Sequence, residues 1–270
     1  MNMSMETGGL VAVGDSVSEG VGDPGRGGAL RGWIHYLTME AETETDPAGR
    51  SGLELVANLA RSGATVAALR RDQLERAVAL APAYVTCVIG VNDVIAGRFD
   101  VARFEEDYAH VVAALSGAAG VGVLTMTLHD VGAALPLPRA RRAELRRRIA
   151  EANEVIERVS RRHGAWLIDA CTAGRPERAG IVCVDRLHPN RRGHRYLAAL
   201  AGDVLRAGGA APAVATALPA ADPPLDRIAS GARHALWVGK HLVRPLAGAV
   251  FTSRRAARVR ASSPPAGRRS

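Results

Sequence analysis

The amino-acid sequence predicts an α/β fold, a doubly wound three-layer sandwich built on a five-stranded parallel sheet. Two observations predict it. Short apolar runs alternate with longer segments of helical period over residues 8–206. The apolar runs are almost uninterrupted by polar residues, which is typical of strands covered by helices on both faces of a sheet. In such a fold we expect the functional site at the carboxyl ends of the strands.

Five segments have the composition of buried strands. Residues 10–13 read Leu-Val-Ala-Val, and residues 83–89 are almost wholly apolar and rich in β-branched side chains. Each segment is followed by one of helical period, so the strands are expected to run parallel. In chain order, strands are expected at residues 10–13, 53–58, 83–89, 121–127 and 166–168.

Five further segments have the spacing of helices that pack on one side. Residues 65–80 carry apolar side chains at roughly helical intervals, and residues 139–163 carry a continuous inner stripe. Arginines and glutamates share the outer side of that long segment, which indicates an ion-paired face in solvent. In chain order, helices are expected at residues 30–40, 65–80, 101–115, 139–163 and 191–205.

The sequence divides into three regions. Residues 8–206 form the α/β domain, and residues 207–224 are rich in Ala, Gly and Pro, as linkers are. Residues 225–270 form a basic C-terminal extension. Its apolar spacing up to Phe251 predicts an amphipathic helix, and the Arg- and Pro-containing remainder predicts a disordered tail.

The formal net charge of +8 belongs entirely to the C-terminal end. Residues 1–205 carry 24 Arg against 25 acidic residues, whereas residues 206–270 carry 11 basic residues against two acidic ones. Arginine supplies 34 of the 35 basic residues, a bias typical of coding composition rather than of a basic surface. We therefore expect no specific nucleic-acid partner. The extension either makes a weak peripheral contact with an anionic membrane or keeps the chain in solution.

The three cysteines, Cys87, Cys171 and Cys183, show neither paired spacing nor neighbouring histidines of a metal site. We therefore expect no disulfide framework, no metal and no cofactor. The first residues lack a basic segment followed by an apolar one, and no run of about 18 apolar residues occurs. These features favour a cytoplasmic protein.

Ser16 follows the first expected strand, in the sequence Gly14-Asp15-Ser16-Val17. A serine at such a strand-to-helix turn is exposed, and its own N–H lies at a helix N-terminus. One residue can then supply both a nucleophile and an oxyanion donor. A serine that only caps the helix is the alternative interpretation.

Other polar groups follow later strands. Asn92, after the third strand, can donate its amide to a developing oxyanion, although Asn-Asp is equally typical of a turn. Asp185 precedes His188 by three residues and can fix one imidazole nitrogen, which leaves the other as a general base. The alternative is a loop histidine capped by a local aspartate. Because these groups and Ser16 come at or beyond the ends of different strands, we expect them to form one site.

In chain order, the motifs resemble those of the SGNH hydrolases, the GDSL-type esterase and lipase superfamily. Gly14-Asp15-Ser16-Val17 resembles the first block, with Val where the name-giving motif has Leu. The later matches are Asn58-Leu59-Ala60-Arg61-Ser62-Gly63 to the second block, Gly90-Val91-Asn92-Asp93 to the third and Asp185-Arg186-Leu187-His188-Pro189 to the fifth. A single block is a weak signal, but the ordered set over about residues 8–206 is specific.

The resemblance implies a flavodoxin-like SGNH fold and a serine hydrolase that cleaves small-molecule carboxylic esters, thioesters or O-acetyl groups through an acyl-enzyme. It implies that Ser16 is the nucleophile, His188 the base and Asp185 the residue that orients the base. The oxyanion hole that it implies consists of the Ser16 N–H, the Gly63 N–H and the Asn92 side chain. The alternative function is that of a catalytically weak or inactive member that binds a membrane surface or an anionic partner through its basic extension.

Several segments near these motifs bear on ligand binding. Residues 20–25 match G-x-G-x-x-G, but they lie well past the strand end and contain a proline, so we expect no dinucleotide site. We expect the loops 20–28 and 130–138 to set the substrate pocket. His129 and Asp130, after the fourth strand, form a second acid/base pair, line that pocket or make a turn.

Overall fold

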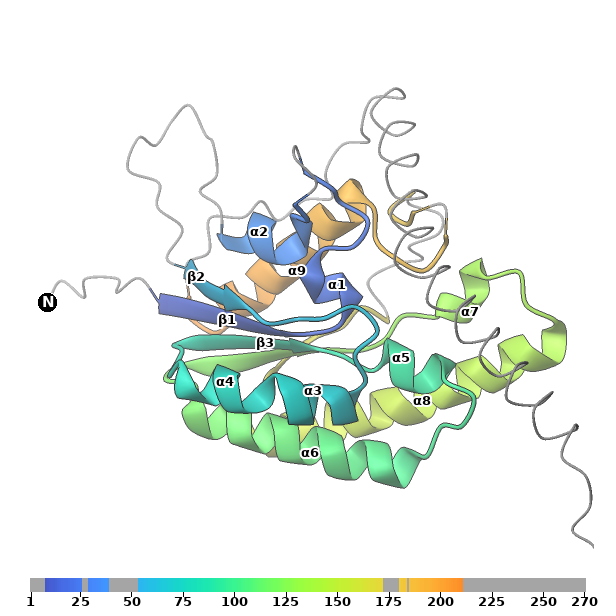
Figure 1. Ribbon diagram of the computed structural model, residues 1–270, viewed down its shortest axis with the longest axis horizontal. Helices are drawn as coiled ribbons and strands as arrows, with labels where there is room; N and C mark the ends of the chain where they lie inside the picture. Colours follow the sequence, from blue (N-terminus) through green and yellow to red (C-terminus); the bar gives the residue numbers. More distant parts are fainter. Residues whose placement is uncertain (1–7, 26–28, 39–52, 172–179, 184, 211–270) are drawn as a thin grey trace, which may run out of the picture.

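The computed structural model describes residues 8–25, 29–38, 53–171, 180–183 and 185–210. The expected extension, residues 225–270, and most of the expected linker, residues 207–224, lie outside the described residues. The described chain forms one parallel sheet with helices on both faces (Figure 1). The α/β sandwich predicted from the sequence is therefore confirmed.

The sheet has five parallel strands in the order β2-β1-β3-β4-β5. They are β1 (Gly8–Gly14), β2 (Leu53–Asn58), β3 (Tyr84–Val88), β4 (Gly122–Met126) and β5 (Trp166–Ile168). The strand order reverses between β1 and β3, and doubly wound folds bind their ligands at such a reversal. Ser16 therefore follows β1 at the place where a ligand is expected.

Helices cover both faces of the sheet (Figure 1). On one face lie α2 (Gly32–Thr38) and α9 (Arg191–Ala207). The other face is covered by α3 (Val66–Asp72), α4 (Leu74–Ala79), α6 (Val101–Ala118) and α8 (Arg139–Arg162). Three short helices lie beyond strand ends: α1 (Ser16–Glu19), α5 (Val91–Ile95) and α7 (Val131–Ala134).

The sheet separates two hydrophobic cores, because successive side chains of a strand point to opposite faces. In β1, Val11 and Val13 face α3, α4, α6 and α8, whereas Leu10 and Ala12 face α2 and α9. All four side chains are fully buried. Trp33, from α2, lies in the second core. The strand that leads to Ser16 is thus fixed from both sides.

One expected helix is divided into two. The segment 65–80 forms α3 and α4, which meet at Gln73, where φ and ψ are −120° and −34°. The buried Gln73 side chain bonds to both backbone polar groups of Gly14, each at 2.9 Å. The apolar period of the segment does not reveal this tertiary contact. The helix start expected at Ser16 is present as α1, but the sequence did not predict α5 and α7, because four or five residues show no measurable period.

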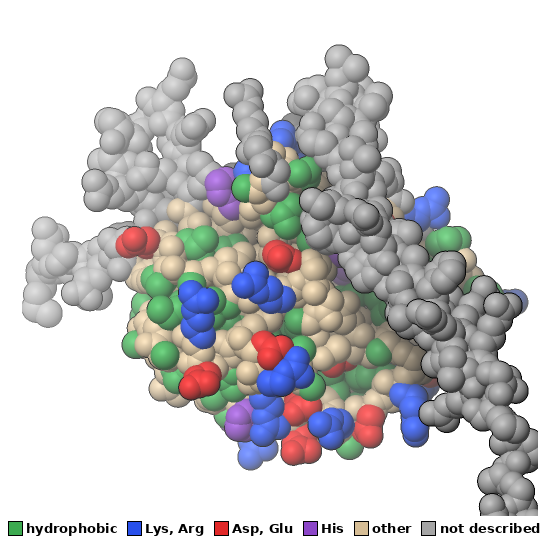
Figure 2. Space-filling view, in the orientation of Figure 1, with side chains coloured by type: hydrophobic (Ala, Val, Ile, Leu, Met, Phe, Trp, Pro, Cys, Tyr) green, Lys and Arg blue, Asp and Glu red, His purple; other side chains and the backbone are tan. Residues whose placement is uncertain are grey.

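Charged side chains of both signs are mixed on the described surface. On α8, Arg147 pairs with Glu144 and Glu151, as expected for an ion-paired face. Figure 2 shows positive and negative side chains interspersed over α3, α4 and α6, where Arg70 contacts Asp107 at 2.8 Å. Within the described residues, none of the helices combines the length and the apolar character that a membrane span requires.

Candidate active site

Ser16 is the first residue of α1, immediately beyond β1. Gly14 ends the strand with φ +146°, and a Cβ there would lie 2.2 Å from the Val88 carbonyl oxygen, so this turn requires glycine. The Asp15 carboxylate caps α1 by accepting from the Val17 N–H at 3.0 Å. The helix cap is therefore Asp15 and not Ser16, which leaves the Ser16 hydroxyl available for another contact.

That hydroxyl contacts a histidine from the other end of the domain. Ser16 Oγ lies 2.9 Å from His188 Nε2, and His188 Nδ1 lies 2.6 Å from Asp185 Oδ2. The second oxygen of the same carboxylate accepts from the backbone N–H groups of Leu187 and His188, at 3.0 and 3.1 Å. Asp185 therefore does more than cap a loop, because it holds an imidazole whose other nitrogen reaches Ser16.

The loop before α9, residues 180–183 and 185–190, carries His188 and is called the histidine loop. A hydrogen bond between its own backbone groups holds it together. The Cys183 N–H donates to the His188 carbonyl at 2.8 Å. Gly22, in the segment after α1, packs so closely on this loop that a Cβ would lie 1.9 Å from the Pro189 carbonyl oxygen. The loop is thereby pressed against the segment that follows Ser16.

A buried carboxylate strengthens this contact. Asp23 is 1 % exposed and accepts hydrogen bonds from Tyr36 Oη at 2.5 Å and from Arg31 and Arg191, each at 3.3 Å. Arg191 begins α9, three residues after His188. Asp23 therefore joins α2 and the segment after α1 to the end of the histidine loop.

Gly63 and Asn92 follow the two strands that flank β1. Gly63 has φ +78°, and a Cβ there would meet no atom within 4 Å. The Asn92 amide, at the start of α5, donates to the Ala64 carbonyl at 2.9 Å. The neighbouring Asp93 carboxylate accepts from the Val66 N–H, at the start of α3, at 3.1 Å. Two adjacent side chains of α5 thus hold the turn that contains Gly63.

The sequence did not predict the role of two buried side-chain amides beside the site. Gln73 binds the backbone N–H and carbonyl of Gly14. Asn153, from α8, does the same for Leu128, at 2.7 and 2.8 Å. Each amide binds both backbone polar groups of a residue at the end of a strand or just beyond it. A polar residue within a buried helical stripe is the sequence signal that could have found them.

Burial changes the protonation of carboxyl groups near Ser16. Asp15 is 1 % exposed, and burial raises its pKa to about 7, although the Val17 N–H acts in the opposite direction. Burial also raises the pKa of Asp93 to about 6. Around neutral pH, the site is therefore less negative than its composition suggests.

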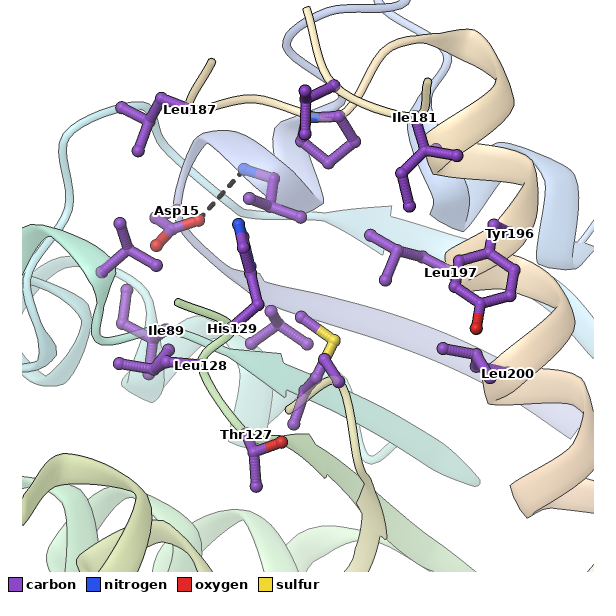
Figure 3. Close-up of a pocket in the computed structure, with 18 residues that line it drawn as sticks. Asp15, Ile89, Thr127, Leu128, His129, Ile181, Leu187, Tyr196, Leu197 and Leu200 are labelled. Carbon is purple, nitrogen blue, oxygen red and sulfur yellow. Dashed lines mark hydrogen bonds between the residues drawn. The ribbon is translucent and has the colours of Figure 1, made fainter. Parts of the chain in front are cut away.

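A cavity lies beside these residues at the carboxyl edge of the sheet (Figure 3). Its walls come from the ends of β3 and β4, the histidine loop and one face of α9. The lining residues are Asp15, Val17, Val88, Ile89, Val91, Met126, Thr127, Leu128, His129, Ala170, Ile181, Val182, Leu187, Pro189, Gly193, Tyr196, Leu197 and Leu200. The described parts of the loops 20–28 and 130–138 contribute none of them, and that these loops set the substrate pocket stays a prediction.

His129 and Asp130 have separate surroundings. His129 lines the cavity. Asp130 caps α7 by accepting from the Ala133 N–H at 3.1 Å, and it pairs with Arg146 of α8 at 2.6 Å. These contacts hold the start of the 130–138 loop on α8, which explains why the described part of the loop does not line the cavity. Among the side chains that the structure describes, no cluster of His, Cys, Asp or Glu suits a metal ion.

Comparisons with known proteins agree with this geometry. The model of the GDSL-like Lipase/Acylhydrolase family matches residues 12–196. LAE5, an alpha/beta hydrolase enzyme from the metagenome of Lake Arreo, Spain, is 25 % identical with a TM-score of 0.55, over 76 % of this chain and 96 % of that one. Axe2, an acetylxylan esterase from Geobacillus stearothermophilus, is 19 % identical with a TM-score of 0.57, over 78 % of this chain and 98 % of that one. A comparison with curated proteins gave no match.

The family match includes the segments that carry Ser16, Gly63, Asn92, Asp185 and His188, and the solved structures share the sheet and its helices. The fold and the motif order therefore agree with the resemblance noted from the sequence. The chain belongs to the GDSL-like lipase/acylhydrolase family and is a carboxylic ester hydrolase of the SGNH type.

Proposed function

We propose that this enzyme hydrolyses small-molecule esters through an acyl-enzyme on Ser16. The observation that carries the proposal is the hydrogen-bonded line from Ser16 Oγ to His188 and on to Asp185, with separations of 2.9 and 2.6 Å. A hydroxyl is a weak nucleophile unless a base takes its proton as it attacks. His188 Nε2 is within reach for that transfer.

In the first step, Ser16 Oγ bonds to the carbonyl carbon of the ester while its proton passes to His188 Nε2. Asp185 accepts from Nδ1–H, which selects the tautomer with a bare Nε2 and stabilises the imidazolium. His188 then gives the proton to the departing alcohol oxygen as the carbon–oxygen bond breaks. The acyl group remains on Ser16.

In the second step, water attacks the acyl-enzyme with His188 again as the base. The proton returns to Ser16 Oγ as the carboxylic acid leaves, so the enzyme is regenerated.

The charge that develops on the carbonyl oxygen needs donors. We assign this role to the Ser16 N–H, the Gly63 N–H and the second N–H of the Asn92 amide. The first N–H of that amide binds the Ala64 carbonyl, which fixes the direction of the side chain. Because Asn92 and Asp93 also hold the turn that contains Gly63, two of the three donors are held together.

Hydrolysis of a chain-length series of p-nitrophenyl esters by the wild-type protein and by Ser16→Ala tests this proposal. We expect wild-type activity on at least one ester and a loss of at least about 10³-fold in kcat in the variant. Ser116→Ala, on α6 and outside the site, is the matched control and should keep wild-type rates. Full activity in Ser16→Ala, or no activity of the wild type on any ester, would contradict the proposal.

The role of the basic extension stays a prediction, because residues 225–270 lie outside the described structure. Every described residue of the site and of the cavity lies between residues 15 and 200. We therefore expect a chain that ends after Arg206 to retain ester hydrolysis. Contact with an anionic membrane would then be a separate property of the extension.

A further inference from the structure

The cavity is lined by the chain neighbours of the reacting groups, although neither Ser16 nor His188 is among its lining residues. Asp15 and Val17, the two neighbours of Ser16, both line it. Leu187 and Pro189, the two neighbours of His188, line it as well. A substrate whose carbonyl carbon lies at Ser16 Oγ would therefore place one of its two arms in this cavity.

The walls of the cavity are mostly aliphatic. Figure 3 shows Leu197 and Leu200 of α9 on one side, and Ile89 and Leu128, beyond β3 and β4, on the other. Met126 adds a side chain that adapts to irregular apolar shapes. These walls favour a hydrocarbon over a sugar, because a sugar in such a cavity would leave its hydroxyl groups without hydrogen bonds.

Four polar side chains line the cavity, Asp15, Thr127, His129 and Tyr196, and the first two are engaged by the protein. The Asp15 carboxylate accepts from the Val17 N–H. The Thr127 hydroxyl accepts from the Cys171 N–H at 3.1 Å and donates to Asp169 at 3.3 Å. These groups therefore have internal partners and do not require a polar ligand.

The extent of the cavity also bears on the ligand. It reaches from the neighbours of Ser16 along the ends of β3 and β4 to Leu200, which lies nine residues into α9. An acetyl group offers a single methyl beyond its carbonyl, and the lining next to Ser16 would already enclose it. Only a longer acyl chain would contact the walls that α9 contributes.

We propose that this cavity binds a medium-length aliphatic acyl chain, so that the enzyme prefers medium-chain acyl esters to acetyl esters. This inference rests on the proposed function of Ser16. We assign the cavity to the acyl arm because that arm stays bonded to Ser16 Oγ through both steps, and both chain neighbours of Ser16 line the cavity. Each methylene that enters such a cavity strengthens binding by about fourfold.

The test compares acetyl, butanoyl, hexanoyl and octanoyl p-nitrophenyl esters, which share one leaving group. For the wild type we expect kcat/KM to rise with each added methylene until the chain fills the cavity, by about tenfold or more in total. Leu200→Trp fills the far end. It should lower kcat/KM for the octanoyl ester by about tenfold and leave the acetyl ester within about twofold of wild type. Leu80→Trp, exposed at the end of α4, is the matched control.

Leu200→Ala is the second variant, in case the protein does not fold with tryptophan at position 200. It removes wall contacts without adding bulk, so it should lower octanoyl hydrolysis severalfold and spare acetyl hydrolysis. Ethyl octanoate and octyl acetate separate the two arms of the ester. The inference predicts that ethyl octanoate is the better substrate.

Three results would overturn the inference. A wild type that hydrolyses the acetyl ester as well as the octanoyl ester has no acyl-chain pocket, although Ser16 would still be its nucleophile. A preference for octyl acetate would assign the cavity to the alcohol arm. Absence of hydrolysis of every ester above the Ser16→Ala background would contradict the proposed function itself, and the inference with it.

Discussion

Each member of the line from Ser16 to Asp185 is held by contacts outside that line. Asp15 caps the helix that begins at Ser16. The second oxygen of Asp185 binds two backbone N–H groups, so the carboxylate cannot turn away from His188 without losing them. These side chains therefore lose little conformational freedom when a substrate binds. Such preorganisation is where an enzyme of this kind gains its rate.

The ionisation of Asp15 can be measured through the pH dependence of the free energy of unfolding. Its pKa is about 7 in the folded chain, against 3.8 for an unperturbed aspartate. Between these values the folded chain holds a proton that the unfolded chain has released. The free energy of unfolding therefore falls as the pH rises from about 4 to about 7.

We expect Asp15→Asn to remove this dependence, because asparagine also caps a helix but does not ionise. Urea unfolding at pH 5 and pH 8 measures it. The wild type should lose about 2–3 kcal/mol more than the variant over that interval. Asp100→Asn, at the exposed cap of α6, is the control and should behave as the wild type does. Equal losses in Asp15→Asn and the wild type would show that Asp15 ionises normally.

At the scale of elements, the carboxyl ends of β1 and β4 are completed by side chains from the helices of one layer. Gln73, between α3 and α4, binds the backbone N–H and carbonyl of Gly14, the last residue of β1, and Asn153 of α8 does so for Leu128, two residues beyond β4. Both contacts fix where a strand stops. Only the first of them lies at the strand that leads to Ser16.

Gln73→Leu should therefore affect both stability and catalysis. It leaves the buried N–H of Gly14 without a partner, at about 1–3 kcal/mol, and the Gly14 carbonyl keeps only the Arg61 N–H at 3.1 Å. It also releases the turn before Ser16. We expect a lower midpoint of urea unfolding and a fall of about tenfold or more in kcat, with KM less affected.

Asn153→Leu provides the comparison, because it removes an equivalent pair of bonds at Leu128. It should destabilise the chain at least as much, because the Gly14 carbonyl keeps a second partner in Gln73→Leu, and it should change kcat less. Equal losses of kcat in the two variants would mean that Gln73 acts through general stability and not by positioning Ser16.

The central strands were predictable because helices cover them on both faces, whereas β2, at the edge of the sheet, is mostly exposed. In β1 and β3, burial on both faces leaves almost no polar residue to interrupt the apolar run. Long helices such as α8 were predictable from their stripes. The break at Gln73 depends on a tertiary contact that no local period records, and the short helices after β3 and β4 are too brief to show a period.

At the scale of the whole molecule, parallel strands bring distant segments to one edge. Ser16 and His188 are 172 residues apart and yet in hydrogen-bond contact. The sequence predicted this meeting because each residue comes at or beyond the end of a different strand. It did not predict the cavity, whose walls are ordinary apolar residues of α9, such as Leu197 and Leu200, that carry no motif. Ligand chemistry was therefore less accessible from the sequence than the reacting groups were.

Covalent trapping of the nucleophile tests the account most directly. A p-nitrophenyl alkylphosphonate transfers its phosphorus to an activated serine oxygen and releases p-nitrophenolate, and peptide mass mapping then locates the adduct. We predict a single adduct per chain, on Ser16, that forms in step with the loss of ester hydrolysis and is strongly slowed in His188→Ala. An inactivated protein whose adduct lies on another residue, or an active esterase in which Ser16 is never labelled, would contradict the account.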